Sequence, residues 1–139
     1  MSWIKDLLGM GRKVQPVSVT DENFEAEVLG ADLPVMMDVW SATCGPCKQL
    51  APIVVDLATD YEGRVKVAEM NAATAPGVAS RLGIRGTPTV IYFVKGREVE
   101  RVVGFRGSLY HREIIDHEIL AAGSGHEPDG GPSGQDLEG

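Results

Sequence analysis

The stretch Cys44-Gly45-Pro46-Cys47 constrains this chain most, because it holds both cysteines of the sequence. An apolar stretch that favours a strand, residues 35–40, precedes it. Two thiols three positions apart on the first turn of a helix lie close together, at the positive end of the helix dipole. Both effects favour a thiolate at Cys44, and the thiolate is the species that attacks a disulfide. The helix is predicted by apolar side chains at helical spacing over residues 48–61: Leu50, Ile53, Val54, Leu57 and Tyr61.

Other uses of a cysteine pair remain open at this point. A structural zinc site needs about four ligands, and the chain has no second cysteine pair. The spacing of His111, His117 and His126 does not suggest two ligands that would complete a site. Redox chemistry is therefore the favoured interpretation, and a metal-binding pair or an inert pair of buried thiols are the alternatives. We predict no metal and no cofactor.

Composition excludes several classes of function. The chain has 139 residues, 43% of them hydrophobic, which fits one domain with a real core. Its formal charge of −7 argues against nucleic acid as a partner. No stretch approaches the roughly 20 apolar residues of a membrane span, and Lys5 and Asp6 interrupt the apolar start, so we expect no integral membrane segment and no export signal. We therefore expect a reducing, cytoplasmic location, where a disulfide is transient.

The order of elements predicts an α/β fold. Strand and helix patterns alternate as β-α-β-α-β-α-β-β-α, which implies a mixed sheet with parallel strands and an antiparallel hairpin. Ser108 is expected to cap the last helix, which should bury Leu109, Ile115 and Ile119. The predicted strands are residues 17–19, 35–40, 64–70, 89–94 and 99–103, and the predicted helices are residues 20–30, 48–60, 74–82 and the segment from 108.

Three segments are predicted along the chain. Residues 1–16 form an N-terminal extension, in which residues 2–10 can make a short amphipathic helix that packs on its own domain or docks on a membrane surface or partner. Residues 17–122 form the domain. Residues 123–139 are an acidic tail rich in Gly and Pro, which we expect to be disordered because it has almost no apolar surface to bury.

Beyond the cysteine pair, further residues form a recognisable pattern: Asp38, Trp40, the run 44–48, Pro52, Asn71, the run Gly86-Thr87-Pro88-Thr89 and Gly104. With these residues, the sequence resembles the thioredoxin family over roughly residues 17–122. The resemblance implies a thioredoxin fold, in which helices flank a mixed central sheet. It also implies a monomeric protein-disulfide reductase that acts on disulfide-containing proteins and is reloaded by an NADPH-dependent thioredoxin reductase.

The active-site run has a role for each residue. Cys44 is the expected nucleophile, which forms a mixed disulfide with the target, and Cys47 is expected to attack Cys44 and release the reduced target. Gly45 and Pro46 set the spacer, because Pro fixes φ and suits a first helical turn. Lys48 adds positive charge beside the thiols, although most lysines at helix starts are only solvated.

Two acids are expected to control protons. Asp38 stands in an apolar strand, where burial should raise its pKa, and the matching acid of the family exchanges a proton with the second thiol. Glu69 stands where most members carry Lys; its strand position predicts that it faces Asp38, so that the two carboxylates titrate together. The alternatives are an edge-strand Asp38 in water and a Glu69 that turns to solvent.

The resemblance also implies a substrate-binding segment. In the family the proline that matches Pro88 is cis and faces the disulfide, and the residue before it, here Thr87, pairs with the substrate backbone. Gly86 and Gly104 are expected to allow close backbone approach. The alternatives are a trans proline at a strand start and glycines without substrate contact. Thr43 replaces the usual Trp before the first cysteine, and we expect the bulky Phe105 to restore some of the missing apolar surface.

Three functions follow from these observations. The first is a thiol–disulfide oxidoreductase that reduces protein disulfides through Cys44 and Cys47. The second is a docking or chaperone-like binding module in which the thiols matter little. The third keeps the same thiols but works as a disulfide oxidase or isomerase, since direction depends on reduction potential.

Overall fold

The structure, a computed structural model, describes residues 12–123. The predicted helix at residues 2–10 lies outside the described residues, as does the predicted tail beyond Gly123. None of the described helices is long and apolar enough to cross a membrane.

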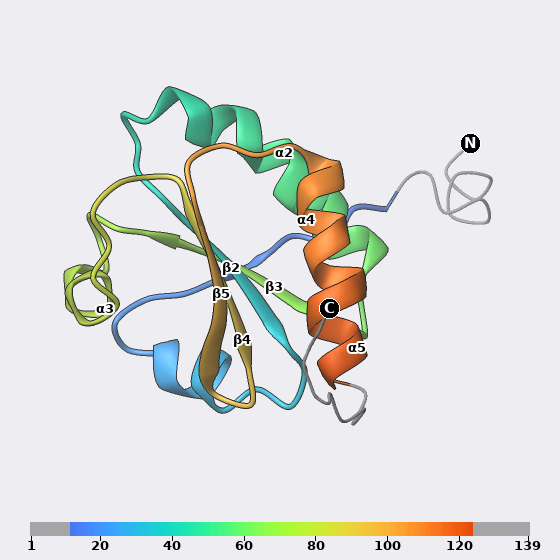
Figure 1. Ribbon diagram of the computed structural model, residues 1–139. Coiled ribbons are helices and arrows are strands. Elements are labelled where there is room, and N and C mark those ends of the chain that lie inside the picture. Colours follow the sequence, from blue (N-terminus) through green and yellow to red (C-terminus); the bar gives the residue numbers. More distant parts are fainter. Residues whose placement is uncertain (1–11, 124–139) are drawn as a thin grey trace.

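A five-stranded mixed sheet forms the centre of the domain (Figure 1). The strand order is β1-β3-β2-β4-β5, so that β2 occupies the middle. β3 pairs in parallel with β1 and β2, whereas β4 pairs antiparallel with β2 and β5. The strands are β1 (Val17–Ser18), β2 (Val35–Trp40), β3 (Lys66–Asn71), β4 (Thr89–Val94) and β5 (Arg97–Val103).

Helices cover both faces of this sheet. On one face lie α2 and a continuous helix made of α4, η2 and α5, and on the other lie η1 and α3 (Figure 1). This arrangement, a mixed sheet with helices on both faces, is the fold that the resemblance implied. The helices are η1 (Glu25–Leu29), α2 (Gly45–Asp60), α3 (Pro76–Arg81), α4 (Ser108–Ile114), η2 (Ile115–Ile119) and α5 (Leu120–Gly123).

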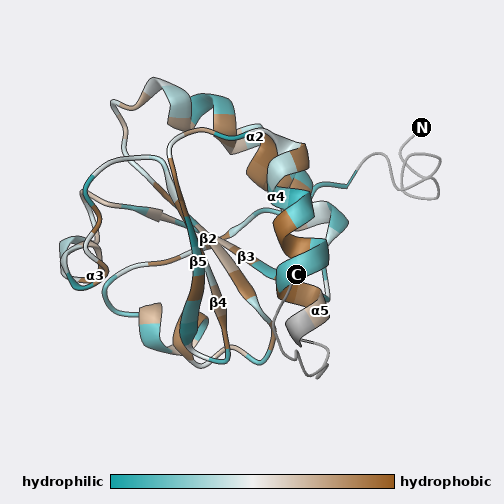
Figure 2. Cartoon of the chain, in the orientation of Figure 1, coloured by the Kyte–Doolittle hydropathy of each residue, from teal (hydrophilic) through white to brown (hydrophobic). Residues whose placement is uncertain are grey.

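Strand alternation divides the core into two layers. Met36 of β2 packs with α2 and the C-terminal helix, while its neighbour Met37 packs with η1 and α3. Figure 2 shows hydrophobic residues concentrated in the inner strands, whereas the helices alternate hydrophobic and hydrophilic residues. By the same alternation Asp38 of β2 must face the α2 layer, which decides the geometry of the site described below.

Several boundaries of the elements differ from the prediction by one or more residues. α2 begins at Gly45 rather than Lys48, because the residues between the cysteines are already helical. β5 begins at Arg97, since the hairpin turn needs only Lys95 and Gly96, whose φ angles of 52° and 79° are those of a tight two-residue turn. At the N-terminal end, Lys13 pairs with Asp56 of α2, so contacts of the domain begin before residue 17.

The prediction for the last helix was partly wrong. Ile115 and Ile119 are buried as expected, but Leu109 is 70% exposed. Gly107 rather than Ser108 is the residue before the helix, and the Ser108 hydroxyl accepts a hydrogen bond from Arg112 instead of capping the backbone. The first turn of α4 therefore presents a different face to the sheet than the apolar spacing indicated.

A buried histidine joins the last helix to the sheet. His111 of α4 is fully buried, and its Nδ1 lies 2.7 Å from the hydroxyl of Tyr92 in β4. Burial, with a smaller effect of the positive charge of Arg106, lowers the pKa of His111 to about 4. This side chain is therefore neutral in the folded protein at neutral pH.

His111 should make the fold sensitive to acid. Its pKa rises from about 4 in the folded chain to the ordinary 6.5 in the unfolded chain. The unfolded state therefore binds the extra proton below pH 6.5, and the folded state loses about 3 kcal/mol of stability as the pH falls to 4. We expect His111→Gln to lose less stability over this pH range in urea unfolding, and His117→Gln, which changes an exposed histidine of the same helix, to behave like the parent. Equal losses in parent and His111→Gln would contradict this assignment.

Candidate active site

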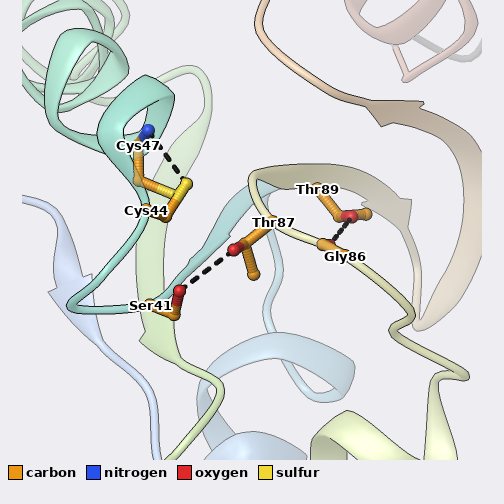
Figure 3. The surroundings of a disulfide bond; sticks show 6 residues. All are labelled: Ser41, Cys44, Cys47, Gly86, Thr87 and Thr89. Carbon is orange, nitrogen blue, oxygen red and sulfur yellow. Dashed lines mark hydrogen bonds between the residues drawn. A yellow bond between two sulfur atoms is a disulfide. The ribbon is translucent and has the colours of Figure 1, made fainter.

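The two cysteines lie where β2 gives way to α2. Cys44 has extended backbone angles and caps the helix, and its Sγ accepts a hydrogen bond of 3.1 Å from the backbone N–H of Cys47 (Figure 3). The cysteines form a disulfide with Cα atoms 5.3 Å apart. Pro46 occupies the first helical turn. Backbone N–H groups have no acceptor within the helix at this position, so the N–H that proline lacks is not needed. Cys44 is half-buried and Cys47 is buried, so Cys44 is the more accessible sulfur.

The segment before β4 meets the segment before α2. The hydroxyls of Ser41 and Thr87 lie 3.1 Å apart (Figure 3). The Thr87–Pro88 bond is cis, as predicted. The Thr89 hydroxyl donates to the carbonyl of Gly86, which closes this segment on itself. Figure 1 shows these segments and the one after β5 at the same end of the sheet. Ser41, which sequence reasoning missed, therefore ties the cysteine segment to the expected substrate-binding segment.

The two predicted glycines differ in what they require. The N–H of Gly104 donates to the carbonyl of Pro88 at 2.8 Å, and its φ of 95° disfavours other residues. Gly86 has no such φ, and a Cβ atom there would meet nothing within 4 Å. Within this chain Gly86 therefore has no conformational need to be glycine, and both glycines leave open space beside the disulfide end of the sheet.

Asp38 is buried in the central strand. It is 4% exposed, and its Oδ1 has no hydrogen-bond partner among residues 12–123. Burial, with the negative charge of Glu69 adding to it, raises the pKa of Asp38 to about 7. The alternative of an edge-strand acid in water is therefore wrong, and near neutral pH this carboxyl can both give and take a proton.

Glu69 lies next to Asp38. The two residues are paired in the parallel register of β2 and β3, and both face the α2 layer. Glu69 is half-buried, and its Oε1 accepts a hydrogen bond from the indole N–H of Trp40. The prediction that Glu69 faces Asp38 is thus confirmed, but the role of Trp40 as its donor was not foreseen.

A cleft of about 550 Å³ connects these groups with Cys47. Asp38 and Glu69 lie in its wall from the sheet, and Cys47 and Lys48 lie in its wall from α2. Sequence reasoning missed the contribution of the residues before β1, because nothing in their pattern marks them. The full lining is Gln15, Pro16, Asp38, Trp40, Ser41, Ala42, Cys47, Lys48, Ala51, Val54, Val55 and Glu69.

Apolar side chains are exposed around the end of β5. Val103 is 69% exposed and Phe105 is 40% exposed, on either side of the Gly104 that contacts Pro88. Thr43, beside Cys44, is exposed as well. An incoming polypeptide near the disulfide therefore meets an apolar side chain at Phe105 and a small polar one at Thr43.

The arrangement can exchange disulfides. It combines an accessible sulfur, a second sulfur within bonding distance and a buried acid that can handle protons in the same cleft as the second sulfur. Among residues 12–123, no group of three or more His, Cys, Asp or Glu side chains could hold a metal ion.

Comparisons with known proteins agree with this chemistry. The thioredoxin family model matches residues 15–116. "Thioredoxin 1" of Nostoc sp. is 48% identical over 86 residues, which is 62% of this chain and 80% of that protein. "Thioredoxin" of Rickettsia bellii is 45% identical over 102 residues, 73% of this chain and 97% of that protein. "Thioredoxin M5, chloroplastic" of Oryza sativa subsp. japonica is 40% identical over 107 residues, 76% of this chain and 62% of that protein.

Proposed function

This chain belongs to the thioredoxin family and is a protein-disulfide reductase, and we propose that an NADPH-dependent thioredoxin reductase supplies its electrons. The observation that carries the function is the Cys44–Cys47 disulfide at the start of α2, with Cys44 the more accessible sulfur. A reductase of this kind cycles between that disulfide and the dithiol.

The reaction proceeds in two exchanges. The Cys44 thiolate attacks a sulfur of the target disulfide; a bond forms between Cys44 and the target, and the other target sulfur leaves as a thiolate. Cys47 then gives up its proton and attacks the Sγ of Cys44, which releases the second target thiolate and closes the Cys44–Cys47 disulfide. Both target thiolates take protons from water, and two electrons have passed to the target.

Asp38 is the proposed proton partner of Cys47. Both line the same cleft, and the pKa of Asp38 is raised to about 7, chiefly by burial. An acid of that strength accepts the Cys47 proton when the disulfide closes and returns it when the disulfide is reduced. Lys48, which lines the cleft too, adds positive charge that favours the thiolates.

The proposed substrate surface surrounds the cis proline. Thr87 and Pro88 present backbone beside the disulfide, and the open space at Gly86 and Gly104 admits a second chain. Phe105 supplies apolar contact on the side of β5. Thr43 removes a large aromatic contact from the other side, so Phe105 should carry more of the binding here.

Phe105→Ala should weaken the binding of protein substrates. We expect KM for a disulfide-containing protein to rise about fivefold to tenfold, equivalent to roughly 1 kcal/mol of lost contact, with little change in kcat. Reaction with a small disulfide should stay unchanged, because such a molecule does not reach the Phe105 ring. Val99→Ala, which removes an exposed valine from the hairpin end of β5, is the matched control. An unchanged KM for protein substrates would remove Phe105 from the surface.

We also place the reductase in the cytoplasm, as a monomer. A protein that receives its electrons from an NADPH-dependent reductase works in a compartment where thiols are kept reduced. A monomer can present the same disulfide end of the sheet first to its donor and then to its target.

NADPH consumption tests the electron donor. The full chain is mixed with NADPH, a purified thioredoxin reductase and insulin, and absorbance of NADPH is followed. We expect oxidation of NADPH that requires all three proteins. The chain could reduce insulin with dithiothreitol but support no NADPH oxidation with any of several thioredoxin reductases. In that case the proposed electron donor is wrong, while the disulfide chemistry stands.

A further inference from the structure

Asp38, Trp40 and Glu69 form a connected group in the cleft that Cys47 lines. Asp38 and Glu69 pair across β2 and β3, Trp40 stands two residues beyond Asp38 on the same face of β2, and its indole N–H reaches Oε1 of Glu69 at 2.5 Å. All three line the cleft that also contains Cys47. The group therefore links a half-buried carboxylate to a buried one in the cleft that also contains Cys47.

The two carboxyl groups have unequal surroundings. Glu69 is half-buried, and its Oε1 accepts the hydrogen bond of the Trp40 indole. A donor in this position stabilises negative charge on the oxygen that accepts from it. Asp38 is 4% exposed, and its Oδ1 has no donor among the described residues, which disfavours charge there. Since two adjacent carboxylates do not both ionise readily, one proton is retained between them near neutrality.

We propose that the indole N–H of Trp40 holds the negative charge of the pair on Glu69, so that the retained proton sits on Asp38, in the cleft beside Cys47. Trp40 and Glu69 are then positioning residues, since they act on the reaction only through Asp38. The inference rests on the proposed function, in which Asp38 exchanges a proton with Cys47.

Other charged groups around the pair are few. From α2, Lys48 and Cys47 line the same cleft. The chain before β1 contributes Gln15 and Pro16, which carry no charge, and β4 places Val90 opposite Asp38. Among these described neighbours only Lys48 is a basic residue, and it is exposed. The placement of the proton therefore depends mainly on Trp40 and burial.

The placement has a consequence for the reaction. When a donor thiolate attacks Cys44 of the disulfide, the Cys44–Cys47 bond breaks, and Cys47 leaves as a thiolate that takes the proton of Asp38. The charge created on Asp38 then stands beside the charge already on Glu69. In the reverse step the Cys47 thiol returns its proton to Asp38 before it attacks Cys44. The negative Glu69 thus makes Asp38 a stronger base for that return.

Carbon-13 NMR of the carboxyl groups tests where the proton resides. In the full chain we expect the step near pH 7 to move almost entirely the carboxyl carbon of Asp38. In Trp40→Phe, which removes the N–H and keeps an aromatic ring, the same step should divide between Asp38 and Glu69. In Glu69→Gln, which keeps an acceptor for Trp40 and loses the charge, the Asp38 midpoint should fall by about one pH unit or more. Glu62→Gln, an exposed residue, is the control for net charge.

A pH profile of disulfide closing gives the functional readout. The reduced protein is mixed with an excess of a small disulfide, and the reaction is stopped with acid. Mass spectrometry then distinguishes the mixed disulfide from the closed Cys44–Cys47 form. The rate of closing should rise with pH, with a midpoint that moves downward in Glu69→Gln and stays in place in Glu62→Gln. A proton step confined to Asp38 in Trp40→Phe, as in the parent, would overturn the inference, and so would an Asp38 midpoint and a closing profile unchanged in Glu69→Gln. If the parent never closes its disulfide, the proposed function itself fails.

Discussion

Cys44→Ser should reduce insulin no faster than dithiothreitol alone. A serine hydroxyl is not ionised at neutral pH and cannot form a disulfide with the target, so the first exchange is lost. Removal of a nucleophile of this kind lowers turnover by about a thousandfold or more. Turbidity of the released insulin chains measures this directly.

Cys47→Ser provides the matched control, because it changes the same pair of sulfurs and keeps the nucleophile. This variant should still attack the target but should accumulate the mixed disulfide at Cys44, which mass spectrometry detects. A Cys44→Ser protein as active as the parent would instead support the docking or chaperone-like alternative, in which the thiols matter little.

Asp38→Asn should stabilise the protein in alkaline solution. The pKa of Asp38 is about 7 in the folded chain and has the ordinary value of 3.8 in the unfolded chain. Because the pKa is raised on folding, the chain has its full stability with respect to Asp38 below pH 3.8, where this residue is protonated in both states. That contribution is lost as the pH rises through 7. A shift of about three pKa units corresponds to roughly 4 kcal/mol in the free energy of unfolding. The buried amide of Asn has its own desolvation cost, which reduces this gain by about 1 kcal/mol. The variant should therefore gain about 3 kcal/mol at pH 9 and almost nothing at pH 4.

Urea unfolding of parent and variant at both pH values measures the gain. Asp32→Asn, which changes an exposed aspartate before β2, should show no gain at either pH. Equal stability of the parent and Asp38→Asn at pH 9 would mean that Asp38 ionises in the folded chain without penalty. The same variant should close its disulfide more slowly, so that stability and activity change in opposite directions.

The main elements could be predicted because the local signals agree. The apolar run of β2, the helical spacing of α2 and the turn at Lys95-Gly96 each follow from short-range patterns. Asp38 could be placed in the core from its apolar neighbours, and period-two alternation placed Glu69 on the same face. The cis bond at Pro88 was foreseen only through the family resemblance, since an average X–Pro bond is cis in about 5% of cases.

What could not be predicted depends on contacts between distant segments. Leu109 fits the apolar spacing of its helix, but the angle at which α4 meets the sheet leaves it exposed. The hydrogen bond from Trp40 to Glu69 joins residues on different strands, and apolar patterning says nothing about indole donors. The hydroxyl pair of Ser41 and Thr87 likewise arises only when two loops meet.

The most direct test of the central claim is alkylation of the reduced protein with iodoacetamide across a range of pH, with each cysteine resolved by peptide mass. We predict that Cys44 reacts much faster than Cys47, and that its rate reaches half of the maximum below the pH of about 8.5 at which an ordinary thiol does so. Equal rates at both cysteines, with half-maximal reaction at the ordinary pH, would contradict the assignment of Cys44 as the nucleophile and Cys47 as the residue that resolves the mixed disulfide.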